Sequence, residues 1–137
     1  MKNLKWIVGL FIISSFALQS CLDDESTQNV TYHYKGIDSI SIGEINSARQ
    51  VTEITTYFTR SNSCERFFDY EYQRLGNERT VTMVTYRMGD VCTQETVLDS
   101  AVLRFRPEVG GNYTFRFWNS NDEDNNPVFI TTDVLIP

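Results

Sequence analysis

Apolar and polar residues alternate along most of the chain from about residue 30 onward. Alternation places every second side chain on one face of an extended strand, whereas an amphipathic helix repeats its apolar residues three and four positions apart. Seven segments rich in β-branched and aromatic residues carry this pattern, and no segment after residue 30 favours a helix. We predict strands at residues 37–42, 50–60, 68–73, 79–87, 101–106, 113–118 and 128–136.

Glycine, asparagine, serine and proline separate the predicted strands, as turns require. In the third strand the aromatic residues are expected on one face and the polar residues on the other. The two faces are Phe68, Tyr70 and Tyr72 against Asp69, Glu71 and Gln73. Seven strands with turn residues between them indicate an all-β, antiparallel sandwich.

A short motif in the second half of the chain refines this fold class. The run Leu103-x-Phe105-x-Pro107-x-x-x-Gly111-x-Tyr113 resembles the tyrosine corner of immunoglobulin-like and fibronectin-III-like sandwiches. The resemblance implies a seven-strand immunoglobulin-like sandwich in which the Tyr113 hydroxyl hydrogen-bonds backward to the main chain. Such a fold implies no particular chemistry, because it hosts binding, adhesion and structural roles alike.

Residues 1–20 have the parts of a secretory signal peptide: two lysines, an apolar run over residues 6–18, and the small residue Ser20. The apolar run is shorter than the roughly 20 residues that a transmembrane helix needs. Its end, Leu18-Gln19-Ser20-Cys21, resembles the lipobox of bacterial lipoproteins. The resemblance implies that Cys21 becomes the first residue and carries lipid, which anchors a protein stably when it has two or more acyl chains. The alternative is an ordinary secretory signal in which Cys21 is incidental.

This interpretation divides the chain into a signal peptide at residues 1–20, a lipidated cysteine with a flexible tether at residues 21–29, and the sandwich at residues 30–137. The tether is polar and contains the acidic run Asp23-Asp24-Glu25. Acidic residues after a lipidated cysteine resemble the export signals of Bacteroidota-type surface lipoproteins, and a solvated linker is the alternative. We therefore expect a lipid anchor in the bacterial outer membrane, in either its periplasmic or its surface-facing leaflet.

The charge of the chain excludes one class of partner. Without residues 1–20 the chain keeps ten of its twelve basic residues and all eighteen acidic ones, which gives a net charge of −8. Nucleic-acid binding needs clustered lysine and arginine, and Lys35 is the only lysine left. We expect no nucleic-acid partner, contact with the membrane through the lipid on Cys21, and a monomer.

The cysteine count predicts one disulfide. Of three cysteines, a lipidated Cys21 leaves the pair Cys64 and Cys92 in a chain bound for an oxidising compartment. Neither occupies the inter-sheet position of an antibody domain, so the resemblance extends to the sandwich and not to that lineage. A redox or zinc role is the alternative, but there is no C-x-x-C motif and His33 is the only histidine.

Candidate catalytic residues are few. A serine or cysteine triad would have to use His33, and the chain has neither a G-x-S-x-G motif nor a glycine-rich phosphate loop. A glycosidase would need only two carboxylates, but their spacing in sequence cannot place such a pair. We expect no enzyme and no cofactor.

One acidic segment copies part of a calcium-binding pattern. Asp122-x-Asp124-x-Asn126, followed by Asp133, has the spacing of EF-hand ligands. Pro127 stands where that loop needs glycine, and Asp133 falls inside a predicted strand. The three loop residues are therefore weak metal candidates, and a solvated hairpin loop is favoured.

The last predicted hairpin supplies the candidate ligand site. If Trp118 lies opposite Phe129, the polar residues of both strands share one face and Asp133 is not buried, so this register is favoured. Trp118 and Phe129 then lie side by side on the outer face, next to Asn119 and Asn121 of the following loop. Such a cross-strand aromatic pair is favoured as one that only stabilises the hairpin or packs beneath a neighbouring loop. The alternative is a recognition surface, because an exposed tryptophan beside amide side chains can bind a sugar or a protein.

Two functions are compatible with these features. The first is a lipid-anchored binding or adhesion module for a glycan or a protein partner. The second is a structural or accessory subunit of an envelope assembly, with no ligand of its own. The further resemblance to small Bacteroidota-type surface lipoproteins implies a location and no ligand.

Overall fold

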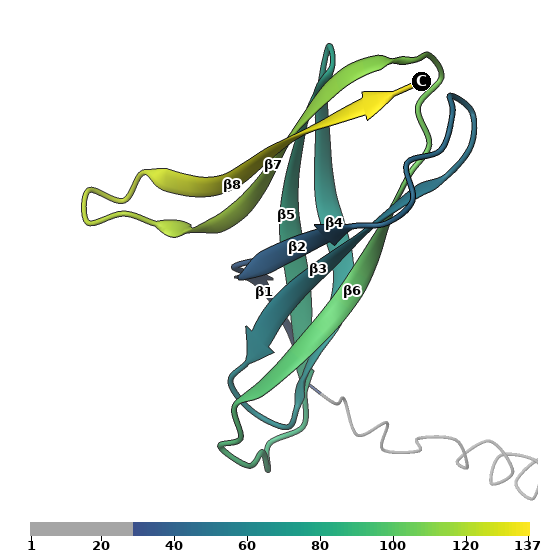
Figure 1. Cartoon of the computed structure of the whole chain (residues 1–137). Helices are drawn as coiled ribbons and strands as arrows, with labels where there is room; N and C mark the ends of the chain where they lie inside the picture. Colours follow the sequence, from purple (N-terminus) through teal and green to yellow (C-terminus); the bar gives the residue numbers. More distant parts are fainter. Residues whose placement is uncertain (1–28) are drawn as a thin grey trace, which may run out of the picture.

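The computed structural model describes residues 29–137, which form eight β-strands and no helix (Figure 1). The strands are β1 Val30–Lys35, β2 Ser39–Ile42, β3 Thr52–Arg60, β4 Glu65–Leu75, β5 Glu78–Met88, β6 Val97–Phe105, β7 Gly111–Asn121 and β8 Pro127–Ile136. Within this described range there is accordingly no helix able to cross a membrane. The predicted signal peptide and the lipidation site Cys21 lie outside the described residues.

The strands form two sheets. β2, β3 and β6 make an antiparallel sheet in the order β2-β3-β6. In the five-stranded sheet, β4 pairs with β5 along nearly its whole length, so β1 and β7 share the opposite edge of β5. β1 lies beside residues 83–88 and β7 beside residues 78–81, while β8 pairs with the far side of β7. We call the place where β1 and β7 diverge from this shared edge the fork.

The predicted all-β sandwich class is confirmed, with an eighth strand and one parallel pair, β5 and β7. β1 was not predicted because none of its six residues is buried, so it lacks the apolar core face on which the prediction of strands relied. The predicted strand at residues 37–42 begins two residues later, as β2. Ile37 is instead fully buried in the crossover between β1 and β2.

The core lies between the two sheets. Its buried apolar side chains come from alternate positions of five strands and from the crossover: Ile37, Ile54, Phe58, Val81, Met83, Ala101, Leu103, Phe105, Tyr113, Phe115, Phe117, Val134 and Ile136. Phe105 and Phe115 belong to different sheets and pack edge to face, with ring centroids 4.9 Å apart. The Tyr113 hydroxyl donates to the Val109 carbonyl at 2.9 Å, which is the backward hydrogen bond that a tyrosine corner implies.

The prediction that Phe68 shares a face of β4 with Tyr70 and Tyr72 is wrong. A β-bulge between Phe67 and Asp69 adds one residue to the strand, so Phe68 lies on the outer side of the sheet while Tyr70 and Tyr72 pack against the core. Phe67 joins them there, with its ring centroid 4.9 Å from that of Tyr70. An extra residue inverts the alternation, and the amino-acid pattern contains no signal of its position.

After β1 the chain crosses to the other sheet directly against β7. The Ile37 amide donates to the Trp118 carbonyl at 3.0 Å, and Asn119 Nδ2 donates to the Ile37 carbonyl at 2.9 Å. A Cβ atom at Gly36 would lie 1.9 Å from the Asn119 carbonyl oxygen. Only glycine therefore allows the crossover to approach β7 this closely.

The predicted disulfide is present. Cys64 and Cys92 are bonded, with 5.5 Å between their Cα atoms. Cys64 directly precedes β4 and Cys92 follows β5, so the bond closes the open end of the β4–β5 hairpin. Beside it, the Ser63 amide donates to the Thr93 carbonyl and the Thr93 amide donates to Ser63 Oγ.

Candidate binding face

The predicted register of the last hairpin is confirmed. Trp118 pairs with Phe129, and the polar pairs follow on the same face as predicted: Arg116 with Thr131 and Thr114 with Asp133. Trp118 and Phe129 are both half-buried. The Arg116 guanidinium lies 4.2 Å from the centroid of the Phe129 ring, so Phe129 stacks under a cation of its own hairpin.

Trp118 lines a pocket at the fork, which we call the fork pocket. It has a volume of about 290 Å³ and is lined by residues from four strands: Tyr34, Glu71, Thr82, Trp118 and Asn121. The Trp118 indole Nε1 donates to Asn121 Oδ1 at 3.1 Å, which fixes the ring and orients the amide. Aromatic and polar side chains therefore meet around one small cavity.

A second cavity adjoins the fork pocket along β1, and we call it the tyrosine pocket. It has a volume of about 340 Å³ and is lined by Tyr32, His33, Tyr34, Glu71 and Val84. Because Tyr34 and Glu71 line both cavities, the two pockets are neighbours on one face of the sheet.

A hydrogen bond between Tyr34 and Glu71 stands between the two pockets. The Tyr34 hydroxyl donates to Glu71 Oε2 at 2.6 Å, and since β1 and β4 flank β5, the bond crosses over β5. The hydrogen bond to Glu71 raises the pKa of the Tyr34 hydroxyl, and the negative charge of the Glu71 carboxylate raises it further. Tyr34 is 62% exposed, so its ring remains available to a ligand.

Further aromatic side chains extend this surface along β1. The Phe68 ring centroid lies 4.7 Å from that of Tyr32 and 6.3 Å from that of Tyr86, both in edge-to-face geometry. Phe68 reaches this position only because the bulge in β4 turns it outward. We use the name outer aromatic face for the set Tyr32, Tyr34, Phe68, Tyr86, Trp118 and Phe129.

Of the four predicted ligand residues, the structure brings two together. Trp118 and Asn121 line the fork pocket, whereas Phe129 and Asn119 line neither pocket. Asn119 uses its side-chain amide to bind the Ile37 carbonyl, so it holds the crossover in place.

Sequence reasoning did not predict the other residues that line the two pockets as ligand residues, namely Tyr32, His33, Tyr34, Glu71, Thr82 and Val84. Tyrosines at alternate positions of residues 30–35 are a signal of an exposed aromatic strand, and they could have indicated β1. The meeting of four strands at one pocket depends on the parallel pairing of β5 with β7, for which the sequence has no local signal.

The predicted calcium candidates Asp122, Asp124 and Asn126 form hydrogen bonds with one another within their own loop. Asp122 accepts hydrogen bonds from the amides of Asn126 and Asp124 and from Asn126 Nδ2. The bond from the Asn126 amide contributes most to lowering the pKa of Asp122. Asp133 lies on β8, where its Oδ1 accepts a bond of 2.6 Å from Thr114 Oγ1. Over residues 29–137, no three His, Cys, Asp or Glu side chains are grouped to hold a metal ion.

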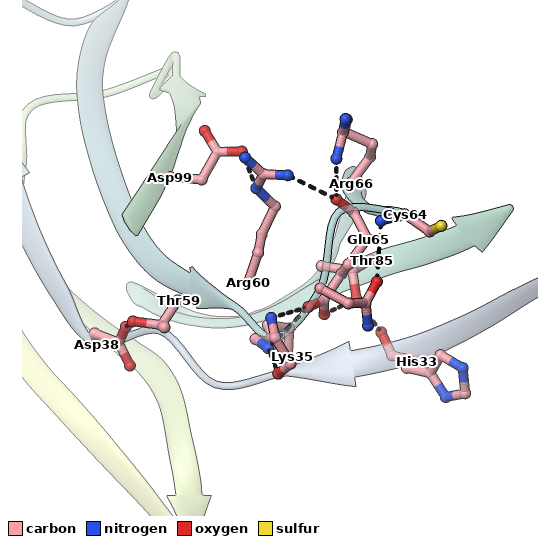
Figure 2. A network of polar contacts seen from close by, with 12 residues as sticks. His33, Lys35, Asp38, Thr59, Arg60, Cys64, Glu65, Arg66, Thr85 and Asp99 are labelled. Carbon is pink, nitrogen blue, oxygen red and sulfur yellow. Dashed lines mark hydrogen bonds and ion pairs between the residues drawn. The ribbon is translucent and has the colours of Figure 1, made fainter. Parts of the chain in front are cut away.

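A polar cluster centred on Glu65 lies near the disulfide (Figure 2). Its carboxylate accepts bonds from Lys35 Nζ at 3.1 Å, from the Ser61 amide at 2.9 Å and from Thr85 Oγ1 at 3.0 Å. Burial raises the pKa of Glu65, but the bonds from Ser61, Lys35 and Thr85 together outweigh it and leave the pKa below its usual value. This cluster ties β1, β4 and β5 together. His33 is exposed, with Nε2 3.2 Å from Thr31 Oγ1.

Taken together, the fold and the face define a small all-β domain whose outer sheet surface combines aromatic rings with carboxylate and amide groups. Comparisons of the chain with protein-family models, with curated proteins and with solved structures find no match. The function must therefore be argued from the chemistry of this face.

Proposed function

We propose that this protein is a lipid-anchored domain of the bacterial cell envelope that binds a glycan through the fork pocket and the tyrosine pocket. The observation that carries the proposal is the pair of adjacent cavities, about 290 and 340 Å³, that share Tyr34 and Glu71. Two neighbouring cavities of similar size suit two consecutive units of a chain built from repeating rings.

The side chains around the pockets match the chemistry of a sugar. Sugar rings present C–H faces that pack on aromatic rings, which Trp118, Tyr34 and Tyr32 supply. Sugar hydroxyls need acceptors and donors at the rim, and Glu71, Thr82 and Asn121 offer both kinds. An apolar platform with a polar rim is thus present in both halves of the site.

The same surface is less suited to a protein partner or to an acidic sugar. A stable protein interface buries about 800 Å² on each side around an apolar centre, whereas the Tyr34–Glu71 bond places a charged group at the centre of this face. The carboxylates of Glu71 and Asp69 lie on the outer side of β4 and repel an anionic ligand. We therefore favour a neutral glycan.

The glycan proposal can be tested with an array of neutral oligosaccharides and with calorimetry on the best binder. We expect Trp118→Ala and Tyr34→Ala each to lower the affinity at least tenfold while shifting the melting temperature by only a few degrees. Tyr57→Ala is the matched control, because Tyr57 is half-buried on the outer side of the other sheet. Absence of binding on the array, or equal loss in the control, would contradict the proposal.

A protein partner or a purely structural role are the competing outcomes of this test. If the array shows no ligand but the purified protein captures an envelope protein, and Trp118→Ala abolishes the capture, the face binds protein. If neither ligand nor partner depends on Trp118, the accessory-subunit interpretation gains support.

The anchoring part of the proposal rests on the lipobox-like run at residues 18–21. Metabolic labelling with a palmitate analogue should mark the wild-type protein, and the label should vanish in Cys21→Ala. Protease added to intact cells then distinguishes the surface from the periplasmic side. Labelling that persists in the variant would contradict lipidation at Cys21.

A further inference from the structure

A third cavity lies away from the outer aromatic face, between the β4–β5 turn and the β6–β7 connection. It has a volume of about 520 Å³. Four of the nine arginines of the chain line it, namely Arg74, Arg79, Arg104 and Arg106, and Glu108 is the only acidic residue of the lining. In a chain with a net charge of −6, this concentration of positive charge is exceptional. We call it the arginine pocket.

Arg79 is the unusual member of the set, because it is only 8% exposed. Its Nη1 donates to the carbonyls of Gly76 and Glu78, at 2.6 and 2.8 Å. Among the described residues, no carboxylate pairs with its guanidinium, and its buried Nε has no hydrogen-bond partner. The guanidinium carbon lies 5.0 Å from the ring centroid of Tyr113 and 5.9 Å from that of Phe105.

A buried guanidinium without a counter-ion is unfavourable, because arginine is almost never fully buried unless it is paired. The faces of two aromatic rings recover part of the lost hydration through cation–π attraction, but they do not neutralise the charge. An anion in the adjoining cavity, which Arg79 lines, would supply the missing counter-charge.

The other arginines leave the cavity positive. Arg104 Nε is 3.9 Å from Glu53 Oε1, and both side chains are largely exposed, so solvent screens this pair. Arg106 Nε donates to the Arg49 carbonyl, which orients the side chain without neutralising it. Four arginines against one glutamate give the lining a formal charge of +3.

We propose that the arginine pocket binds an oxyanion, a carboxylate or phosphate group of a small ligand, with Arg79 as the buried anchor and Arg74 and Arg106 as exposed partners. The planar fork of arginine donates two parallel hydrogen bonds to either group, which a lysine cannot do. This site is separate from the neutral-glycan site, so either proposal can fail without the other.

The test uses the purified protein and two probes, inorganic phosphate and glucuronate, with sodium chloride adjusted to hold the ionic strength constant. Saturable binding by calorimetry, with a matching rise in melting temperature, is expected for at least one probe. Preference for phosphate or for glucuronate identifies which of the two anionic groups is the better ligand.

The variants separate binding from folding. Arg74→Ala combined with Arg106→Ala alters only exposed side chains and should weaken binding at least tenfold with little change in stability. Arg87→Ala, an exposed arginine at the disulfide end of β5, is the control and should bind as the wild type does. The proposal fails if neither probe saturates, or if the double variant binds as tightly as the control.

Discussion

Replacing Cys64 and Cys92 together by serine should lower the free energy of unfolding by about 3.6 kcal/mol in the chain-entropy model. The disulfide joins residues separated by 28 positions. For a closed loop of that size the model gives a loss of about 12 cal/mol/K in the unfolded state, or about 3.6 kcal/mol at 25 °C. Both cysteines are only half-buried, so the variant loses little apolar burial and the chain entropy should dominate.

The expected loss can be measured as a shift in melting temperature. Unfolding entropy of about 2.1 cal/mol/K per residue, over about 110 residues, converts 3.6 kcal/mol into a decrease of about 15 °C. Thermal and urea denaturation followed by circular dichroism should show this decrease, and the reduced wild type should match the double variant. Before reduction, the wild-type mass should be lower by two hydrogens. A loss below about 1 kcal/mol, or two titratable thiols in the native protein, would refute the reasoning.

Three further predictions concern single residues. The folded-state pKa of Glu65 lies below its usual value of 4.5, so the contribution of its carboxylate to stability is present above pH 4.5 and is lost as the pH falls through the folded-state pKa. Glu65→Gln should therefore make the free energy of unfolding depend less steeply on pH in the acid range. An unchanged pH dependence would contradict this role of Glu65. Gly36→Ala forces a methyl group onto the Asn119 carbonyl and should destabilise the protein by more than about 2 kcal/mol in urea denaturation; a neutral result would mean that the crossover yields. Tyr113→Phe removes the hydrogen bond to Val109 and should cost about 1 kcal/mol, measured in the same way, with ring packing retained.

Much of the sandwich could be predicted because buried alternation is a direct consequence of strand geometry. Phe115 and Phe117 alternate with polar residues in the sequence, and both are fully buried in the structure. The hairpin register followed from the cost of burying Asp133, and it is confirmed. Where one face of a strand is buried and the other is exposed to solvent, the alternation of apolar and polar residues is sufficient to predict the strand and its buried face.

The candidate site could be predicted only in part, because it depends on which strands become neighbours. Trp118 and Asn121 are three residues apart on the same strand, β7, so their proximity in the sequence brings them together. Tyr34 and Glu71 reach the same pocket because β1 and β4 flank β5, and Phe68 joins the face through a bulge. The burial of Arg79 could not be predicted either, because the alternation rule that predicts strands places charged residues on the outer face, whereas Arg79 lies on the inner face of β5.

The direction in which β1 lies along β5 has a mechanical consequence. Val30 pairs with Met88 and Lys35 with Met83, so the described chain begins at the disulfide end and runs toward the arginine pocket. If a lipid on Cys21 holds the protein while a ligand at the opposite end pulls it outward, the force acts parallel to β1. The six residue pairs between β1 and β5 would then be loaded in shear, all at once, and would resist detachment far better than a strand peeled from its end one pair at a time.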